Sequence, residues 1–208
     1  MDGGAFSKLR LELPSGDFAA YLFDCDGTIA DSMPLHYLAW RNALSCWNCE
    51  FPESLFYDWG GYPTADIVRR LNAKQGLQMP VDEVLQAKEH LYYESLPNLK
   101  AVPEVLEHIQ AGFGQIPLAV VSGSTRQSVE ASLMALDLLD KFAVFVCAGD
   151  YKKGKPDPEP FLLAAERLGV TPESCLVFED ADLGIEAART AGMASVKVPP
   201  PWLRVAST

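Results

Sequence analysis

Short apolar runs recur along the chain, and most of them end where small polar or acidic residues begin. The first run, at residues 19–23, is too short for a helix and predicts a buried strand. Four later runs of the same kind predict strands at residues 116–124, 143–147, 175–178 and 194–198. The chain therefore offers five strands for one sheet.

Between the later runs, apolar residues follow the spacing of an amphipathic helix. This pattern predicts helices at residues 102–111, 125–136, 158–168 and 183–191. Strands that alternate with helices of about ten residues are typical of right-handed crossovers between parallel strands. The pattern therefore predicts an α/β fold with a doubly wound parallel sheet.

The stretch after the first strand has a different pattern, because it contains no convincing strand. Its apolar spacing predicts one helix that starts at Pro34 and two more at residues 64–74 and 81–96. We therefore expect residues 33–100 to form an inserted α-helical cap, beside a core made of residues 1–32 and 101–208.

The composition excludes several classes of function. With 17 Lys and Arg against 28 Asp and Glu, the net charge is −11, which argues against a nucleic-acid partner. No apolar run reaches the roughly 20 residues of a membrane-spanning helix, and the N-terminal stretch lacks the order of a signal peptide. We expect a cytoplasmic protein without a membrane partner, either a monomer or a weak homodimer.

The five cysteines form an odd number in a medium-sized chain, which fits reduced thiols better than a disulfide framework. Cys46 and Cys49 have C-x-x-C spacing, but no second pair of ligands lies nearby in the sequence. We therefore expect neither a zinc site nor a redox role there.

Polar groups follow four of the predicted strands. Since the carboxyl ends of parallel strands meet at one edge of a sheet, these groups can converge although they lie far apart in the sequence. In chain order they are Asp24, Asp26, Gly27 and Thr28; Ser122, Gly123 and Ser124; Lys155; and Glu179 with Asp180.

The chemistry of these groups is complementary. The hydroxyl of Ser122, the backbone N–H groups around Gly123 and the ammonium of Lys155 suit a phosphate, whereas Asp24 and Asp180 suit Mg²⁺. A carboxylate can act as a nucleophile at phosphorus once cations neutralise the repulsion between the two anions.

Each group also has an ordinary structural explanation. Asp-Gly and Ser-Gly-Ser are common in turns, a lysine before proline is usually solvated, and acidic residues often stabilise the start of a helix. Their joint placement at four strand ends is much less expected by chance, and it favours a site.

Four segments resemble, in order and approximate spacing, the motifs of the haloacid dehalogenase superfamily. They are F-D-C-D-G-T, V-S-G-S, K-P-D-P-E-P-F and V-F-E-D-A-D-L-G-I-E-A-A-R-T-A-G-M. The resemblance spans nearly the whole chain and is closest to the β-phosphoglucomutase-like subgroup. It implies a Rossmannoid core with a helical cap inserted just after the first motif.

The resemblance also implies roles for the residues. Asp24 would be the nucleophile that becomes a phosphoaspartate, and Asp26 would be the general acid/base, which argues against the dehalogenases themselves. Ser122 would bind the transferring phosphoryl group, and Lys155 would stabilise its charge. The Mg²⁺ shell would comprise Asp24, the backbone carbonyl of Asp26 and Asp180, with Glu179 nearby. We expect the bound substrate beside Gly27, Thr28, Gly123 and Ser124.

Two cap positions bear on the substrate. His36 falls where the subgroup has a histidine near the acid/base, although a histidine at that place could also pack at a hinge. Thr64 stands where the mutase resemblance leads us to expect an arginine for a distal phosphate, although it could simply cap the next helix. The pattern therefore looks closer to phosphatases of sugar phosphates such as fructose 1-phosphate.

Three functions follow from the sequence. The leading one is a Mg²⁺-dependent phosphatase that hydrolyses a small phosphorylated metabolite, a sugar phosphate, through a phosphoaspartate. The second is a β-phosphoglucomutase, which keeps the phosphoryl group on enzyme and sugar. The third is a non-enzymatic, receiver-like phospho-switch, against which the D-x-D on the first strand and the helical insertion count.

Overall fold

The structure is a computed structural model, which describes residues 11–60 and 62–203. Five strands form one sheet in the order β3-β2-β1-β4-β5, and every neighbouring pair is parallel. The strands are β1 (Ala20–Phe23), β2 (Leu118–Thr125), β3 (Val144–Ala148), β4 (Cys175–Glu179) and β5 (Ala194–Lys197). The five predicted strands and their parallel arrangement are confirmed.

Strand β1 lies at the centre of the sheet, and both of its faces are buried. Leu22 packs into one core cluster and Phe23 into the other, on the opposite face. The ring of Phe23 stacks on that of Phe178 in the adjacent strand, with centroids 4.5 Å apart. This double burial explains why the strand is a continuous apolar run rather than an alternating one.

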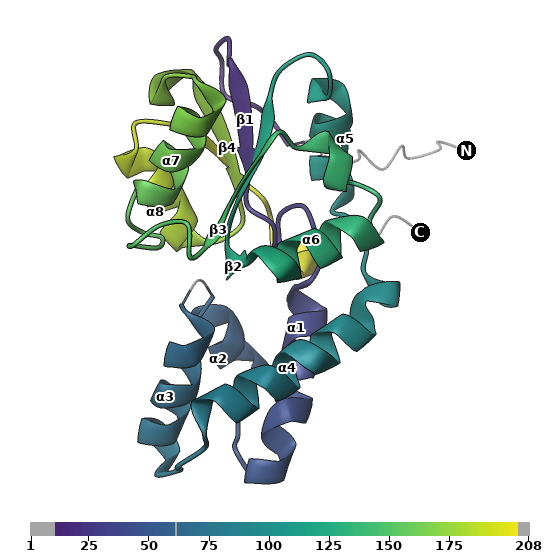
Figure 1. Cartoon of the computed structure of the whole chain (residues 1–208), viewed down its shortest axis with the longest axis vertical. Helices are drawn as coiled ribbons and strands as arrows, with labels where there is room; N and C mark the ends of the chain where they lie inside the picture. Colours follow the sequence, from purple (N-terminus) through teal and green to yellow (C-terminus); the bar gives the residue numbers. More distant parts are fainter. Residues whose placement is uncertain (1–10, 61, 204–208) are drawn as a thin grey trace, which may run out of the picture.

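Helices cover both faces of the sheet (Figure 1). Two of them, α7 and α8, pack with Leu22 on one face, and the other two, α5 and α6, pack with Phe23 on the opposite face. They are α5 (Pro103–Gly112), α6 (Arg126–Ala135), α7 (Glu159–Leu168) and α8 (Asp182–Thr190). The predicted doubly wound α/β fold is therefore confirmed.

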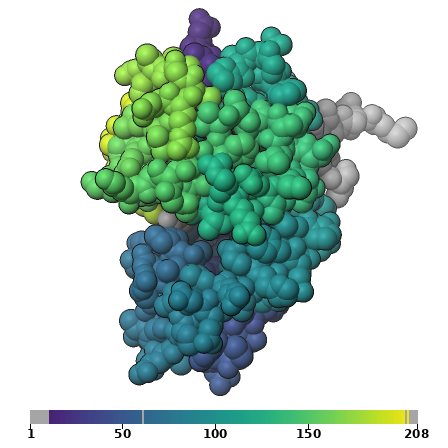
Figure 2. Space-filling view, in the orientation of Figure 1, coloured from purple at the N-terminus to yellow at the C-terminus, as the bar shows by residue number. Residues whose placement is uncertain are grey.

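The segment between β1 and α5 is helical and has an apolar cluster of its own. Figure 1 shows its helices together, beyond the carboxyl end of β2. They are α1 (Met33–Leu44), α2 (Glu53–Asp58), α3 (Thr64–Gln75) and α4 (Val81–Ser95). Trp40, Phe56 and Leu71 are among the residues that pack in their shared cluster. The space-filling surface is hollowed where this helical segment meets the sheet (Figure 2).

Short 3-10 helices complete the described secondary structure. They lie at Ser45–Trp47, Leu96–Asn98, Leu139–Lys141, Pro172–Ser174 and Pro201–Leu203. None of the helices in residues 11–60 and 62–203 is long and apolar enough to cross a membrane. The five cysteines are unpaired.

Strand β2 continues further than the apolar run indicates. It includes the polar residues from Ser122 to Thr125, and its register against β3 shifts between Val121 and Thr125. Thr125 is the N-cap of α6, where its side chain accepts a hydrogen bond from the Ser128 N–H, rather than the first helical residue. The polar end of β2 is thus an irregular strand.

Candidate active site

The carboxyl ends of β1 and β4 bring three carboxylates together. Phe23 is paired with Phe178 in these adjacent strands, and the Asp24 N–H donates to the Phe178 carbonyl at 2.9 Å. Carboxylate oxygens of Asp24, Glu179 and Asp180 consequently lie within 4.8 Å of one another. These three residues are called the carboxylate cluster below.

Lys155 reaches this cluster from the loop that follows β3. Its Nζ donates to Asp24 Oδ1 at 2.7 Å, to Glu179 Oε1 at 2.6 Å and to the Val121 carbonyl at 2.9 Å. The three protons of the ammonium are thereby all used. Burial alone would lower the pKa of Lys155, but Asp24 and Glu179 outweigh it and raise that pKa, so the lysine stays charged.

The carboxylate cluster carries more negative charge than Lys155 can balance. Burial, reinforced by the charge of Glu179, raises the pKa of Asp24 to about 7 even though Lys155 opposes the shift. Burial and the charge of Asp24 raise the pKa of Asp180 well above its usual range. Three oxygen ligands with unbalanced charge are what a hard divalent cation requires, so these residues fit Mg²⁺.

Two glycines allow this close approach. At Gly27 the backbone has φ +89°, and an added Cβ would overlap Asp180 Oδ2. At Gly184, in the first turn of α8, an added Cβ would overlap the carboxylate of Glu179. A side chain at either position would push a carboxylate out of the cluster.

Gly184→Ala should therefore lower the free energy of unfolding, by about 1–3 kcal/mol, because Glu179 is buried and must move. The direction of this change in stability is informative, since alanine in place of glycine stabilises an ordinary helix by up to about 1 kcal/mol. Urea unfolding measures the change. Glu186→Ala, at an exposed position of the same helix, is the control and should change stability by less than about 0.5 kcal/mol. A more stable Gly184→Ala variant would contradict the close contact.

The side chain of Asp26 lies outside the carboxylate cluster and accepts three hydrogen bonds. Ser32 Oγ and His36 Nε2 approach its Oδ1 at 2.8 and 3.0 Å, and Ser124 Oγ approaches its Oδ2 at 2.7 Å. Burial would raise the pKa of Asp26, but His36 and the two hydroxyls outweigh it and hold that pKa well below its usual range. Asp26 thus links the end of β2 to the start of α1.

His36 is buried between Asp26 and α4. Its ring stacks on Tyr92 with centroids 3.9 Å apart, and its Nδ1 is buried without a hydrogen-bond partner in the described part of the chain. Burial and the nearby Lys88 lower the pKa of His36, although Asp26 opposes them. A neutral imidazole that donates from Nε2 to Asp26 carries no proton on Nδ1 and so needs no acceptor there, which agrees with the lowered pKa.

Three residues around His36 were not predicted from the sequence. Ser32 is fully buried and donates to Asp26, and Lys88 is 4% exposed with its Nζ 5.4 Å from the centre of the Tyr92 ring. The Tyr92 hydroxyl pairs with Ser132 Oγ at 2.8 Å. The signal available in the sequence was slight: a lysine four residues before a tyrosine on the apolar side of a helix.

The remaining predicted residues lie around the ends of β1 and β2. Ser122 is 2% exposed, and its Oγ accepts from the Ser124 N–H at 3.0 Å. Gly123 is exposed, with open space where a Cβ would stand. Thr28 is fully buried and its hydroxyl has no hydrogen-bond partner among the described residues. Lys155 thus contacts Asp24 and also the carbonyl of Val121, the residue before Ser122, so the three residues lie at one edge of the sheet.

Comparisons with known proteins identify the family of the chain. A model of the haloacid dehalogenase-like hydrolase family matches residues 21–198. The fructose-1-phosphate phosphatase YqaB of Escherichia coli is 36% identical over 87% of this chain and 96% of its own. A phosphorylated carbohydrates phosphatase of Thermotoga maritima is 34% identical over 84% of this chain and 82% of its own.

A solved β-phosphoglucomutase from Clostridium difficile has the same fold. Its TM-score is 0.76 at 26% identity, over 86% of this chain and 83% of that one. The family model covers most of the chain, and the residues at the four strand ends lie within the matched range. The chain therefore belongs to the haloacid dehalogenase-like hydrolase family, as its motifs predicted.

Proposed function

We propose that the chain is a Mg²⁺-dependent phosphatase that hydrolyses a small phosphate ester, a sugar phosphate, through a phosphoaspartate on Asp24. The observation that carries the proposal is the position of Lys155, whose ammonium bridges Asp24 and Glu179 beside the end of β2. A buried carboxylate held by a cation at a strand end, with a serine alongside, suits attack on a phosphoryl group.

The residues divide the reaction between them. The free oxygen of Asp24 attacks phosphorus and the ester oxygen leaves, while Lys155 and Ser122 stabilise the charge on the transferring group. Asp26, which is ionised in the free chain, first takes up a proton from solvent, gives it to the leaving oxygen and then accepts one from the water that cleaves the phosphoaspartate, so inorganic phosphate is released. Mg²⁺ held by Asp24 and Asp180 would neutralise phosphate charge.

The relatives support the substrate class. The two proteins named above, from Escherichia coli and Thermotoga maritima, are called phosphatases of fructose 1-phosphate and of phosphorylated carbohydrates. We extend the class, a sugar phosphate, to this chain as part of the proposal. A cytoplasmic monomer or weak homodimer remains our expectation.

We also propose that residues 33–100 act as a cap that selects the substrate. In the proposed reaction Asp24, Ser122 and Lys155 contact only the phosphoryl group, which every phosphate ester shares. Discrimination among sugars then depends on the helical segment, which reaches the site through His36 and its hydrogen bond to Asp26.

A screen of phosphorylated metabolites for phosphate release, with Mg²⁺ and with excess EDTA, tests the proposal. We expect stoichiometric inorganic phosphate from at least one sugar phosphate, with Mg²⁺ only. Conversion of a sugar phosphate into its isomer without phosphate release would favour the mutase instead. No turnover of any ester would overturn both enzymatic functions.

His36→Ala should reduce kcat/KM for the best sugar phosphate by about 10- to 100-fold, because the carboxyl group of Asp26 loses a contact that orients it for proton transfer to a poor leaving group. For p-nitrophenyl phosphate the loss should stay within about threefold, since its leaving group needs little protonation. Steady-state kinetics with both esters measures the difference.

His90→Ala is the matched control for this variant. His90 lies on α4 with its side chain 73% exposed and contacts Glu94 rather than the site, so both esters should react as in the wild type. Equal losses on both esters for His36→Ala, together with a lower Tm, would assign His36 to packing.

A further inference from the structure

Between Val121 and Thr125, where its pairing with β3 is interrupted, the irregular end of β2 is held by side chains. Strand β1 is paired with β2 only as far as Val120, and the register against β3 shifts just after Val121. The carbonyls of Val121 and Ser122 instead accept hydrogen bonds from the loop after β3: Lys155 Nζ donates to the first at 2.9 Å and the Tyr151 hydroxyl donates to the second at 3.1 Å.

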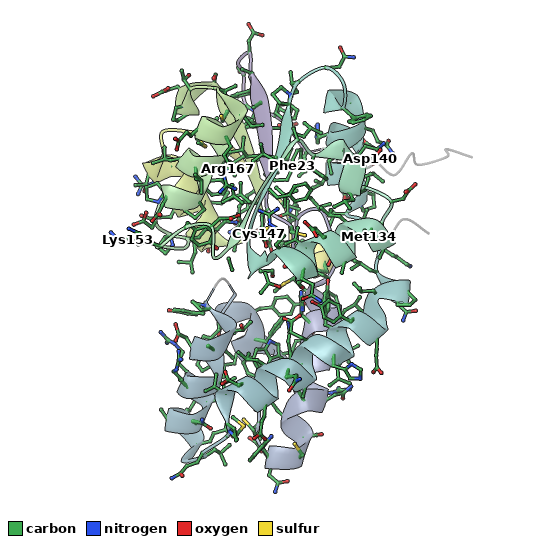
Figure 3. The ribbon with its side chains drawn as sticks, viewed as in Figure 1. Phe23, Met134, Asp140, Cys147, Lys153 and Arg167 are labelled. Carbon is green, nitrogen blue, oxygen red and sulfur yellow. The ribbon has the colours of Figure 1, made fainter. Side chains whose placement is uncertain are left out.

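The loop that supplies these two donors is itself anchored. Asp150 accepts from the Cys147 N–H at 2.9 Å at the end of β3, and Glu159 accepts from the N–H groups of Lys152 and Lys153 at 2.9 and 3.0 Å. The side chain of Lys153 points outward from the molecule, whereas Cys147 lies inside (Figure 3). The loop therefore has an outer attachment at Glu159 and an inner one at β2.

Tyr151 is well placed to make the inner attachment rigid. Its ring packs against the core cluster that contains Phe161 and Val146, and a Cβ on Gly154 would lie 3.4 Å from that ring. A phenol has few rotatable bonds, so a ring fixed in this way fixes its hydroxyl as well. Lys155 and Tyr151 thus donate hydrogen bonds to two consecutive carbonyls of β2.

We propose that Tyr151 is a positioning residue for the phosphoryl-binding end of β2, an inference that rests on the proposed phosphatase function. The peptide that follows Ser122 carries the carbonyl bound by Tyr151 and the N–H of Gly123. Its orientation therefore sets where that N–H and the Ser122 hydroxyl point, relative to Lys155. In the proposed mechanism these groups contact the phosphoryl group and not the leaving group, so we expect Tyr151 to affect phosphoryl binding alone.

Tyr151→Phe removes only the hydroxyl and tests this role. We expect inorganic phosphate, measured as a competitive inhibitor with Mg²⁺, to bind roughly three- to tenfold more weakly, as loss of one hydrogen bond produces. The loss in kcat/KM should be the same for a sugar phosphate and for p-nitrophenyl phosphate, in contrast to the unequal losses expected of His36→Ala.

Glu159→Ala is the matched control, because it loosens the same loop at its outer attachment and leaves the contact with Ser122 intact. It should bind phosphate within twofold of the wild type. If the affinity for phosphate falls equally in both variants, the proposal is overturned, because a general loss of rigidity in the loop would then explain the weaker binding. Phosphate affinity within twofold of the wild type in Tyr151→Phe would overturn it as well.

Amide hydrogen exchange at Gly123 and Ser124 gives a readout that needs no substrate. Exchange should be several-fold faster in Tyr151→Phe and unchanged in Glu159→Ala. If the wild-type chain releases no phosphate from any ester, the proposed function fails, and exchange still decides whether Tyr151 holds this strand end. Unchanged exchange in Tyr151→Phe would overturn the inference.

Discussion

Asp24→Asn should abolish turnover, with a loss of at least about a thousandfold in kcat, while the fold stays intact. The amide oxygen is not a nucleophile, and the substitution removes one charged oxygen ligand from the carboxylate cluster. Asparagine has nearly the same shape and can still accept from Lys155 through its remaining oxygen. It also removes a buried carboxylate whose pKa burial raises to about 7, so ionisation of that group no longer opposes folding.

Phosphate release from a sugar phosphate and from p-nitrophenyl phosphate measures the activity, and thermal unfolding measures the fold. Asp182→Asn is the control, since Asp182 belongs to the same motif as Asp180 but is exposed and pairs with Lys197. It should retain wild-type activity. Retention of more than a few per cent of activity by Asp24→Asn would rule out Asp24 as the nucleophile.

The fold could be predicted from the sequence wherever burial is continuous. Strand β1 is buried on both faces, so its apolar run identified it, and alternation with helices then specified a parallel sheet. The six-residue helix α2 was missed because Phe56 is its single buried residue, which leaves no periodic pattern to recognise. The polar end of β2 was hard to define for a related reason, since its register shift depends on tertiary contacts.

The candidate site could be predicted as far as strand ends determine it. Lys155 lies 131 residues from Asp24 in the sequence, and the convergence of parallel strand ends was enough to predict that they meet. The partners of Asp26 could not be predicted in the same way. Ser124 was expected beside the phosphate, yet its hydroxyl donates to Asp26, because the irregular end of β2 decides where it points.

The contacts of Tyr92 are a further feature that could not be predicted from the sequence. A tyrosine in the apolar stripe of a helix is usually part of a core, and Tyr92 is indeed fully buried. Its contacts nevertheless join three elements: it stacks on His36 of α1, it belongs to α4, and its hydroxyl pairs with Ser132 of α6. Ser132 already donates to the Ser128 carbonyl, so Tyr92 is the donor of that pair. Such a link depends on how the helices cross, which no local pattern encodes.

Asp26→Asn should reduce hydrolysis of a sugar phosphate by about 10²- to 10⁴-fold, because the group that protonates the leaving oxygen and then activates water is lost. The fold should survive. The asparagine oxygen can keep accepting from Ser32 and His36, and its amide can donate to Ser124 Oγ, which rotates to accept. Thermal unfolding should show a change of no more than a few degrees.

A sharper test of Asp26 measures phosphoryl transfer to Asp24 and hydrolysis of the phosphoaspartate separately. With p-nitrophenyl phosphate the first half needs little acid, so Asp26→Asn should still transfer the phosphoryl group to Asp24 and then stall, because no base activates the water. Rapid mixing should show a burst of p-nitrophenolate close to one equivalent per enzyme. Asp24→Asn, which has no nucleophile, should show no burst under the same conditions. If Asp26→Asn instead turns over the sugar phosphate at the wild-type rate, Asp26 is not the acid/base; if it turns over p-nitrophenyl phosphate at the wild-type rate without a burst, the second half of the reaction does not depend on it.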